Sequence, residues 1–426
     1  MLEARIPAPG VRQGIFHSFR FQLGLVLLCG VVLPALIAAN LPHAARFQSG
    51  PVRNSLVFVC LAAIGLVYVI RRLGVFPGNG VAKYILPTLS ILYLLVFATI
   101  AAFRLEYSNR ILLLGFFGTL AARYAIATLN MRGPQRIFYI VPGGRVQMLE
   151  ELPGLVCVRL RAPELPPFPH AVVVGDLHHD HSPEWERFLA EAAIRGTPVF
   201  HYKQIWEACT GQVRMEHLSE NSFGALIPSL AYRKVKRLAD LALCALLLPI
   251  VAPVMLVVAL LIKLEGGGPI FFCQQRMGYR GKRFKVCKFR TMTTVHDGSD
   301  LNASMTQAQD ARITKLGHFL RRTRIDELPQ IWNIIRGEMS WIGPRPEAIS
   351  LSAWYEGELP FYRYRHIVRP GISGWAQVNQ GHVCSLSDVD HKLQFDFYYI
   401  KNISYWMDIL ILLRTVRVVL TGFGAK

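Results

Sequence analysis

Two adjacent carboxylates, Asp326 and Glu327, are the side chains of this sequence best suited to covalent chemistry. A carboxylate can attack phosphorus and form an aspartyl phosphate, which divides one displacement into two easier ones. Pro329 suits the first turn of a helix, so we expect the pair at or before a helix N-terminus, where the dipole favours anions. We also expect Asp326 to be exposed. An isolated Asp-Glu pair is more often a capping acid beside a surface acid, so its neighbours decide the interpretation.

Basic residues on both sides of this pair are suited to binding phosphate. Arg345 is held between two prolines and Arg369 precedes Pro370-Gly371, and a rigidly placed guanidinium donates a fork of hydrogen bonds to phosphate oxygens. Lys288 and Arg290 are weaker candidates, because strand residues on a basic surface also contact lipid headgroups. Two carboxylates that face a diphosphate need neutralisation, which nearby arginines and Mg²⁺ can supply.

The sequence around these residues resembles the bacterial polyprenyl-phosphate (undecaprenyl-phosphate) sugar phosphotransferase family, in its large exopolysaccharide-biosynthesis form with N-terminal membrane helices. Three segments carry the resemblance in the same order over roughly 200 residues, far more than one short motif gives by chance. They are Lys-Phe-Arg-Thr-Met at residues 288–292, the segment 321–346 with the acid pair, and Arg-Pro-Gly-Ile-Ser-Gly-Trp-Ala-Gln-Val-Asn at residues 369–379. Thr291 replaces the usual serine. Residues 310–314 also follow the family pattern and are assigned no chemistry.

The resemblance implies a reaction and a role for each of these residues. A sugar-1-phosphate would pass from a UDP-sugar to undecaprenyl phosphate, with release of UMP and with Mg²⁺ as the metal. Asp326 would be the nucleophile that forms an aspartyl phospho-sugar intermediate, and Glu327 would engage the metal. Arg345 and Arg369 would bind substrate phosphate. Residues 385–390 show no sugar-specific pattern, so the donor sugar stays open.

The composition indicates a membrane protein, because 52% of the 426 residues are hydrophobic and only 18% are charged. Four apolar stretches are each near the length that spans hydrocarbon as a helix, at residues 21–41, 55–70, 84–103 and 111–129. Basic residues concentrate before the first, between the second and third, and after the fourth. We therefore expect four spans with both ends in the cytoplasm. Arg123 in the fourth span is interpreted as an arginine that snorkels or faces another helix.

A fifth apolar stretch at residues 238–262 contains Pro249 and Pro253, which predict a kink at mid-depth. Both flanks are basic and should prefer the cytoplasmic side, so we expect a bent, re-entrant helix. The alternative is a spanning helix kinked by proline, which would export the domain that follows. The terminal stretch at residues 405–420 carries three charged residues and is predicted to be an amphipathic surface helix.

Between these membrane segments, residues 137–141, 171–176 and 198–200 read as buried strands that alternate with helical stretches, which predicts a small Rossmann-like unit. The Gly143-Gly144 turn lacks the Gly-x-Gly-x-x-Gly fingerprint, so a degenerate scaffold is favoured over dinucleotide binding. Adjacent histidines at residues 178–181 cannot all face one ion, so a solvated loop is favoured over a metal site. Eight scattered cysteines without a Cys-x-x-Cys pair argue against a disulfide framework.

These patterns predict a multi-pass protein of the bacterial inner membrane with four parts. Residues 1–131 form a four-helix transmembrane bundle, and residues 132–225 form a degenerate Rossmann-like cytoplasmic domain. Residues 226–265 are a basic entry and re-entrant helix. Residues 266–426 are a mixed α/β catalytic domain at the membrane surface, and both termini are cytoplasmic.

The formal net charge of +19 suits anionic partners such as nucleotides, sugar phosphates and lipid headgroups. No nucleic-acid partner is expected, because no recognised nucleic-acid motif is present. A non-enzymatic transport or assembly scaffold with an anion-binding cytoplasmic domain is the alternative function, but it leaves Asp326 and Glu327 unexplained. A third possible function is a nucleotide-sugar dehydrogenase or epimerase, which would bind a nicotinamide cofactor at the Gly143-Gly144 turn. A homo-oligomer is left open.

Overall fold

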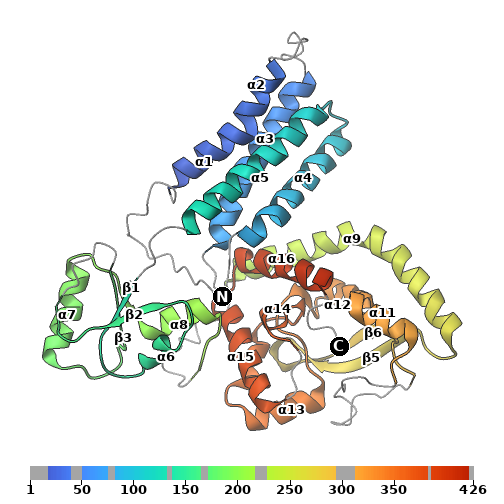
Figure 1. Cartoon of the computed structure of the whole chain (residues 1–426). Helices are drawn as coiled ribbons and strands as arrows, with labels where there is room; N and C mark the ends of the chain where they lie inside the picture. Colours follow the sequence, from blue (N-terminus) through green and yellow to red (C-terminus); the bar gives the residue numbers. More distant parts are fainter. Residues whose placement is uncertain are drawn as a thin grey trace. The chain divides into compact units, whose positions relative to one another are not determined.

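The computed structural model describes residues 18–39, 50–74, 82–131, 137–164, 171–215, 228–293, 312–381 and 385–421. The chain divides into two compact units, Met1–Gly211 and Gln212–Lys426 (Figure 1). Within these described ranges, five helices are long and apolar enough to cross a membrane. Asp310 and Ala311, which follow the family pattern, lie outside the described residues.

The four apolar stretches predicted in the first third are helical. The first consists of α1 (Phe19–Leu27), the π-helical turn η2 (Leu28–Val32) and α2 (Leu33–Ala39), and the others are α3 (Gly50–Leu73), α4 (Ala82–Phe103) and α5 (Asn109–Met131). Helix α5 approaches η2 closely, since a Cβ atom at Gly118 would lie 2.2 Å from the carbonyl oxygen of Cys29. Arg123 is buried and donates to Oε1 of Gln22 at 3.1 Å, which confirms that it faces another helix.

The same unit contains a four-stranded parallel sheet with the strand order β2-β1-β3-β4. Its strands are β1 (Ile137–Ile140), β2 (Val156–Arg159), β3 (Val172–Gly175) and β4 (Val199–His201). Helices α6 (Gln147–Glu150) and α8 (Tyr202–Thr210) pack on one face, and α7 (Pro183–Ile194) packs on the other. The three strands predicted from sequence are confirmed, whereas the largely exposed edge strand β2 was not predicted.

The second unit begins with the long helix α9 (Leu230–Glu265), followed by an antiparallel hairpin of β5 (Phe271–Met277) and β6 (Arg283–Phe289). The two strands are joined by a turn that begins at Gly278 and contains the 3₁₀ turn η5 (Tyr279–Gly281). Strands β7 (Ser340–Ile342) and β8 (Gly371–Ser373) form a short parallel pair. The other elements are α11 (Lys315–Thr323), η6 (Ile325–Gln330), α12 (Ile331–Arg336), α13 (Ile349–Glu358), η7 (Tyr362–Ile367), α14 (Trp375–Asn379), α15 (Leu386–Lys401) and α16 (Tyr405–Thr421).

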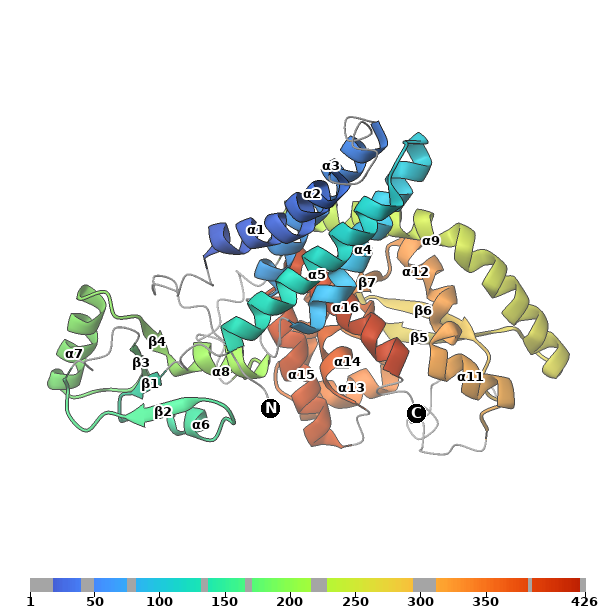
Figure 2. The ribbon, with the colours of Figure 1, turned by 45° about the horizontal axis from the view of Figure 1, so that its top comes forward.

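Helix α9 is bent, and both of its ends contact the domain that follows it in the second unit (Figures 1 and 2). Near its start, Tyr232 and Lys236 each bond to Oδ2 of Asp408 on α16 at 2.6 Å. At its end, the side chain of Glu265 accepts a hydrogen bond from the backbone of Leu316, 3.1 Å away. A straight helix of 36 residues would be about 54 Å long. The bend, in a helix that contains Pro249 and Pro253, instead lets both ends reach one domain.

Two further features of this unit bear on the sequence predictions. Helix α16 buries Met407, Leu410 and Ile411 and exposes Leu412 and Val416, so apolar side chains lie on both of these faces, and its role as an amphipathic surface helix stays a prediction. Cys273 and Cys287 stand directly opposite in the β5–β6 hairpin and form a disulfide bond. This bond was not predicted from sequence, because the spacing of the two cysteines follows from the length of the hairpin and not from a motif.

Candidate active site

The acid pair lies in the 3₁₀ turn η6, which directly precedes α12. Arg324, just before the turn, adopts a left-handed conformation with φ of 60° and separates η6 from α11. The prediction that the pair precedes a helix N-terminus is therefore confirmed, although Pro329 belongs to the 3₁₀ turn and not to the α-helix. The prediction that Asp326 is exposed was wrong. Asp326 and Glu327 are 7% and 5% exposed, because η6 packs against β6.

Three cations surround the carboxylate of Glu327 and all reach the same oxygen, Oε1. Lys288 Nζ lies 2.8 Å away, Arg345 Nη2 lies 2.9 Å away, and Arg324 Nη1 lies 3.9 Å away. Burial alone would raise the pKa of Glu327, but the charges of Arg345, Lys288 and Arg324 outweigh it and hold that pKa well below its ordinary value. Glu327 is therefore an anion at any physiological pH.

Asp326 has a different environment from its neighbour. Among the described residues its Oδ1 atom is buried and has no hydrogen-bond partner. Burial raises the pKa of the Asp326 carboxyl, opposed by Lys288 and increased further by the negative charge of Glu327. A carboxylate oxygen without donors keeps its lone pairs for a reacting atom. Adjacent carboxylates with pKa values shifted in opposite directions are typical of sites where each has its own role.

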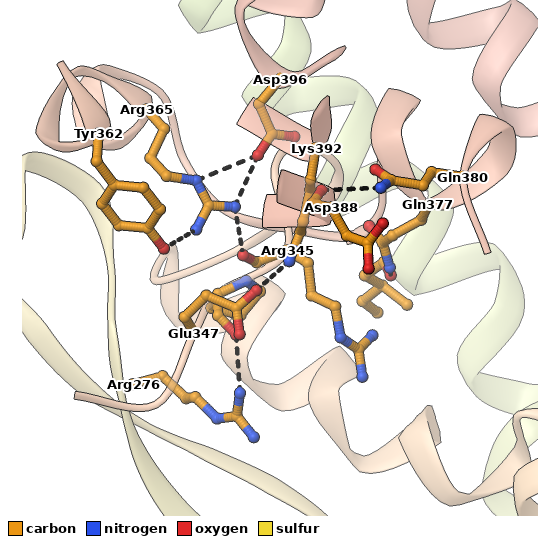
Figure 3. A network of polar contacts seen from close by, with 12 residues as sticks. Arg276, Arg345, Glu347, Tyr362, Arg365, Gln377, Gln380, Asp388, Lys392 and Asp396 are labelled. Atoms are coloured by element: carbon orange, nitrogen blue, oxygen red, sulfur yellow. Dashed lines mark hydrogen bonds and ion pairs between the residues drawn. The ribbon is translucent and has the colours of Figure 1, made fainter. Parts of the chain in front are cut away.

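A buried network fixes the backbone that carries Arg345 (Figure 3). The guanidinium of Arg365 donates to the carbonyl oxygen of Arg345 at 2.9 Å. The same guanidinium donates twice to Oδ2 of Asp396, from Nη2 at 2.8 Å and from Nε at 3.1 Å, and once to the hydroxyl of Tyr362 at 2.8 Å. The side chains of Arg365 and Asp396 are each 2% exposed. The pair therefore positions Arg345 from the protein interior.

Glu347, two residues after Arg345, is the centre of a second group of charges. It forms an ion pair with Lys392 of α15, and Arg276 of β5 donates to the adjacent carbonyl oxygen of Pro346 at 3.0 Å (Figure 3). Burial opposes ionisation of Glu347, but the charges of Lys392, Arg365 and Arg276 lower its pKa to about 2. The segment that presents Arg345 is thus held by the hydrogen bond from Arg365 on one side and by the Glu347–Lys392 ion pair on the other.

The structure brings four of the six predicted site residues together, namely Asp326, Glu327, Lys288 and Arg345. Arg290 instead holds the end of α9, because its guanidinium donates to the carbonyl oxygens of Ile262, Gly266 and Gly267. Arg369 lies over the ring of Tyr279, 5.7 Å from its centroid, and its Nε atom is buried without a hydrogen-bond partner in the described structure.

Arg369 also lines a cavity of about 460 Å³ beside the first turns of α9. This volume lies within the range of small-molecule sites. Six cations contribute to the walls: Arg233, Lys234, Lys236, Arg237, Arg280 and Arg369. Its charge suits an anionic ligand.

Sequence reasoning missed the residues that support the site. Arg365 and Asp396 are 31 positions apart, and neither lies in a family-like motif, so nothing in the sequence links them. Glu347 could have been predicted from the sequence, since it directly follows Arg345-Pro346. Arg324 was also visible beside the acid pair, but was not singled out.

A buried acid pair among cations, in a unit that begins with a long apolar helix, defines a membrane-associated enzyme that acts on an anionic substrate. A model of the family described as bacterial sugar transferase matches residues 231–422. The chain belongs to this family, as the resemblance of its motifs implied.

Named relatives agree with this assignment. The chain is 39% identical over 404 residues to the UDP-N-acetylgalactosamine-undecaprenyl-phosphate N-acetylgalactosaminephosphotransferase of Aeromonas hydrophila, a match that covers 92% of this chain and 95% of the relative. It is 42% identical over 186 residues to the UDP-glucose:undecaprenyl-phosphate glucose-1-phosphate transferase of Escherichia coli, covering 43% of this chain and 40% of the relative. It is 42% identical over 188 residues to the exopolysaccharide production protein PSS of Rhizobium leguminosarum, a match that covers 43% of this chain and 93% of the relative.

Proposed function

We propose that this protein transfers a sugar-1-phosphate from a UDP-sugar to undecaprenyl phosphate and releases UMP, as the first membrane step of exopolysaccharide synthesis. The observation that carries the proposal is the pairing of Asp326, whose buried Oδ1 lacks a partner among the described residues, with Glu327 in its group of cations. The names of the relatives from Aeromonas hydrophila and Escherichia coli support the two substrates.

The proposed reaction has two displacements at the sugar-bearing phosphorus. In the first, an oxygen of Asp326 forms a bond to that phosphorus, and the bond to the oxygen that bridges the two phosphates breaks, so that UMP leaves with the bonding electrons. In the second, a phosphate oxygen of undecaprenyl phosphate attacks the same phosphorus and restores the Asp326 carboxylate. The product is undecaprenyl diphosphate sugar. Arg345 and Lys288 stabilise the negative charge on the phosphate oxygens during both steps.

The acid pair also suits a magnesium ion. Mg²⁺ prefers carboxylate oxygens and substrate phosphates, and the carboxylate of Glu327, whose low pKa keeps it ionised beside Asp326, supplies an oxygen of that kind. We assign Glu327 as the residue that would hold the ion and Asp326 as its neighbour. When bound, Mg²⁺ would neutralise charge on the diphosphate. The measurement that tests this assignment is UMP release with Mg²⁺, with EDTA, and with Mg²⁺ restored.

The membrane arrangement that we propose follows from α9. Lys236 and Glu265, near opposite ends of this helix, bond to Asp408 and Leu316, which both lie in the domain that follows α9. A straight crossing of the membrane would break one of these two contacts. A re-entrant helix keeps both ends on one side, where cytoplasmic UDP-sugars are available. The first four apolar helices would cross the inner membrane as a bundle, and residues 132–225 would form the Rossmann-like cytoplasmic domain.

The orientation can be measured with single cysteines in a variant whose native cysteines are replaced by alanine. An impermeant thiol reagent applied to intact cells should leave Lys315→Cys and Glu358→Cys unlabelled until the cells are opened. Labelling of either position in intact cells would show that the catalytic unit faces outward and would overturn the re-entrant helix.

The experiment that tests the reaction is UMP release by the purified full-length protein with undecaprenyl phosphate and Mg²⁺. UDP-N-acetylgalactosamine and UDP-glucose are the first donors to try, because relatives are named for them. Asp326→Asn should abolish release, since an amide is not a comparable nucleophile. Asp390→Asn, on α15 and outside the acid pair, is the matched control and should keep wild-type activity. Equal release by wild type and Asp326→Asn would refute the mechanism.

A further inference from the structure

A group of metal-binding side chains lies in the first unit, at the carboxyl ends of two neighbouring strands. Asp176 follows β3, His178 lies two residues later, and His201 ends β4. One ligand atom from each of the three lies within 4.8 Å of the others. The side chains of Asp176 and His201 are only 11% and 12% exposed, whereas His178 is exposed. The group is therefore anchored in the domain and open to solvent on one side.

The carboxylate of Asp176 is held in a fixed orientation by the backbone. Its Oδ2 accepts from the N–H of Arg145 at 3.1 Å, and its Oδ1 accepts from the N–H of His178 at 3.2 Å. The turn after β1 comes so close that a Cβ atom at Gly144, which has a φ of +64°, would lie 2.3 Å from Oδ2. Hydrogen bonds of this kind orient the ligands of known metal sites.

His201 is buried against the same carboxylate. Its Nδ1 lies 3.8 Å from Oδ1 of Asp176, 3.2 Å from the N–H of Leu177 and 3.3 Å from the carbonyl oxygen of Gly175. Its Nε2 is buried and has no hydrogen-bond partner in the described part of the chain. A buried ring nitrogen without a partner calls for a water molecule, an ion or a ligand that the protein atoms do not supply.

The position of this group in the sheet points to ligand binding. All four strands are parallel. The chain places β2 on one side of β1 and then β3 on the other side, so the order in which strands are added changes direction between β1 and β3. Open parallel sheets bind ligands outside the carboxyl ends of their strands at such a reversal. The turn that contains Gly144 follows β1 and Asp176 follows β3, so the carboxylate lies at that point.

We propose that Asp176, His178 and His201 bind one divalent transition-metal ion, with water completing its coordination. Two imidazoles and one carboxylate form an open zinc-type ligand set. Imidazole nitrogen favours Zn²⁺ or Co²⁺ over Mg²⁺, so this site differs in chemistry from the acid pair. From sequence, residues 178–181 are expected to form a solvated loop, because adjacent histidines cannot all face one ion. The structure instead joins one of them to His201, 23 residues away, while His179 packs against His181.

The test is a Co²⁺ titration of the full-length protein in detergent, without a polyhistidine tag, after removal of metals by a chelator. Excess Mg²⁺ is included to occupy oxygen-only sites. We expect one Co²⁺ per chain with the visible absorption bands of four- or five-coordinate cobalt, and displacement by Zn²⁺.

Three variants assign the site. His178→Gln and His201→Gln should each weaken Co²⁺ binding by at least about 10-fold. His179→Gln is the matched control and should bind like wild type. His178 is exposed, so its substitution tests the ligand set even where a change at His201 disturbs folding. Wild-type protein that shows no cobalt bands, or a His178→Gln variant with wild-type affinity, would overturn the proposal. Neither result depends on transferase activity.

Discussion

The buried ion pair of Arg365 and Asp396 gives the sharpest prediction about what holds the active site. Asp396→Asn removes the negative charge but keeps the shape, so the Arg365 guanidinium stays buried with no formal counter-charge in direct contact. Removal of one partner from a buried pair destabilises a protein by about 3–5 kcal/mol. Asparagine keeps an acceptor, and Arg365 keeps its hydrogen bonds to Tyr362 and to the Arg345 carbonyl. We therefore expect the lower end of that range, about 3 kcal/mol.

The assay is thermal unfolding of the purified protein in detergent, followed by the release of UMP at a temperature where the variant is folded. For a unit of this size, about 3 kcal/mol lowers the unfolding midpoint by about 6–12 °C. Because Arg365 holds the Arg345 carbonyl, UMP release by folded Asp396→Asn should also be slower. The control Asp390→Asn changes an acid on the same helix that is less buried, and should shift the midpoint by less than about 2 °C.

Two results would refute this reasoning. An Asp396→Asn midpoint within about 2 °C of wild type would show that the pair adds little stability. A double variant, Arg365→Met with Asp396→Leu, replaces both charges by apolar groups and should recover much of the lost stability. It removes the hydrogen bond to the Arg345 carbonyl, so its activity should stay low. A double variant with wild-type activity would show that Arg365 does not position Arg345.

Three further outcomes follow from the charges. Burial raises the pKa of the Asp326 carboxyl. As the pH decreases, the burst of UMP formed without lipid acceptor should therefore begin to fall at a higher pH than it would with an ordinary aspartate, whose pKa is about 3.9. A burst that falls only at or below about pH 3.9 would contradict this. The pKa of Glu347 is lowered from 4.5 to about 2, because the charges of Lys392, Arg365 and Arg276 outweigh its burial. Ionised Glu347 should therefore contribute about 3 kcal/mol above about pH 4.5 and lose it as the pH falls toward 2; Glu347→Gln should flatten this dependence of the unfolding midpoint, and an unchanged slope would count against it. Lys288→Met should reduce UMP release by about 100-fold or more, whereas Arg290→Met should act mainly by lowering the stability of the fold. If both variants reduced the rate per folded molecule equally, the different roles assigned to these two residues would be wrong.

The parts of the fold that sequence predicted are those with local signals. Residues 137–141 and 171–176 form apolar runs, and their strands were found, whereas Val156–Arg159 is an edge strand with exposed side chains and no such run. The prolines of α9 marked a bend that the structure contains. The disulfide between Cys273 and Cys287 depends on strand register, which spacing alone does not reveal.

The candidate site divides in the same way. Asp326 and Glu327 lie in one motif, and their place before a helix could be predicted from Pro329. Their burial could not, because it depends on β6, which is about 40 residues earlier in the chain. Arg290 was selected for its charge, but its guanidinium caps the end of α9. Pairs such as Arg365 and Asp396 arise only when η7 and α15 pack, so a single sequence gives no sign of them.

The most direct test of the central claim is a search for the phospho-sugar on Asp326. Purified protein is incubated with Mg²⁺ and the UDP-sugar that supports UMP release, without lipid acceptor, then digested and examined by peptide mass spectrometry. We predict a peptide with a sugar-phosphate on Asp326 that disappears when undecaprenyl phosphate is added and that Asp326→Asn never shows. UMP release in the absence of any such adduct, or an adduct on another residue, would contradict the account.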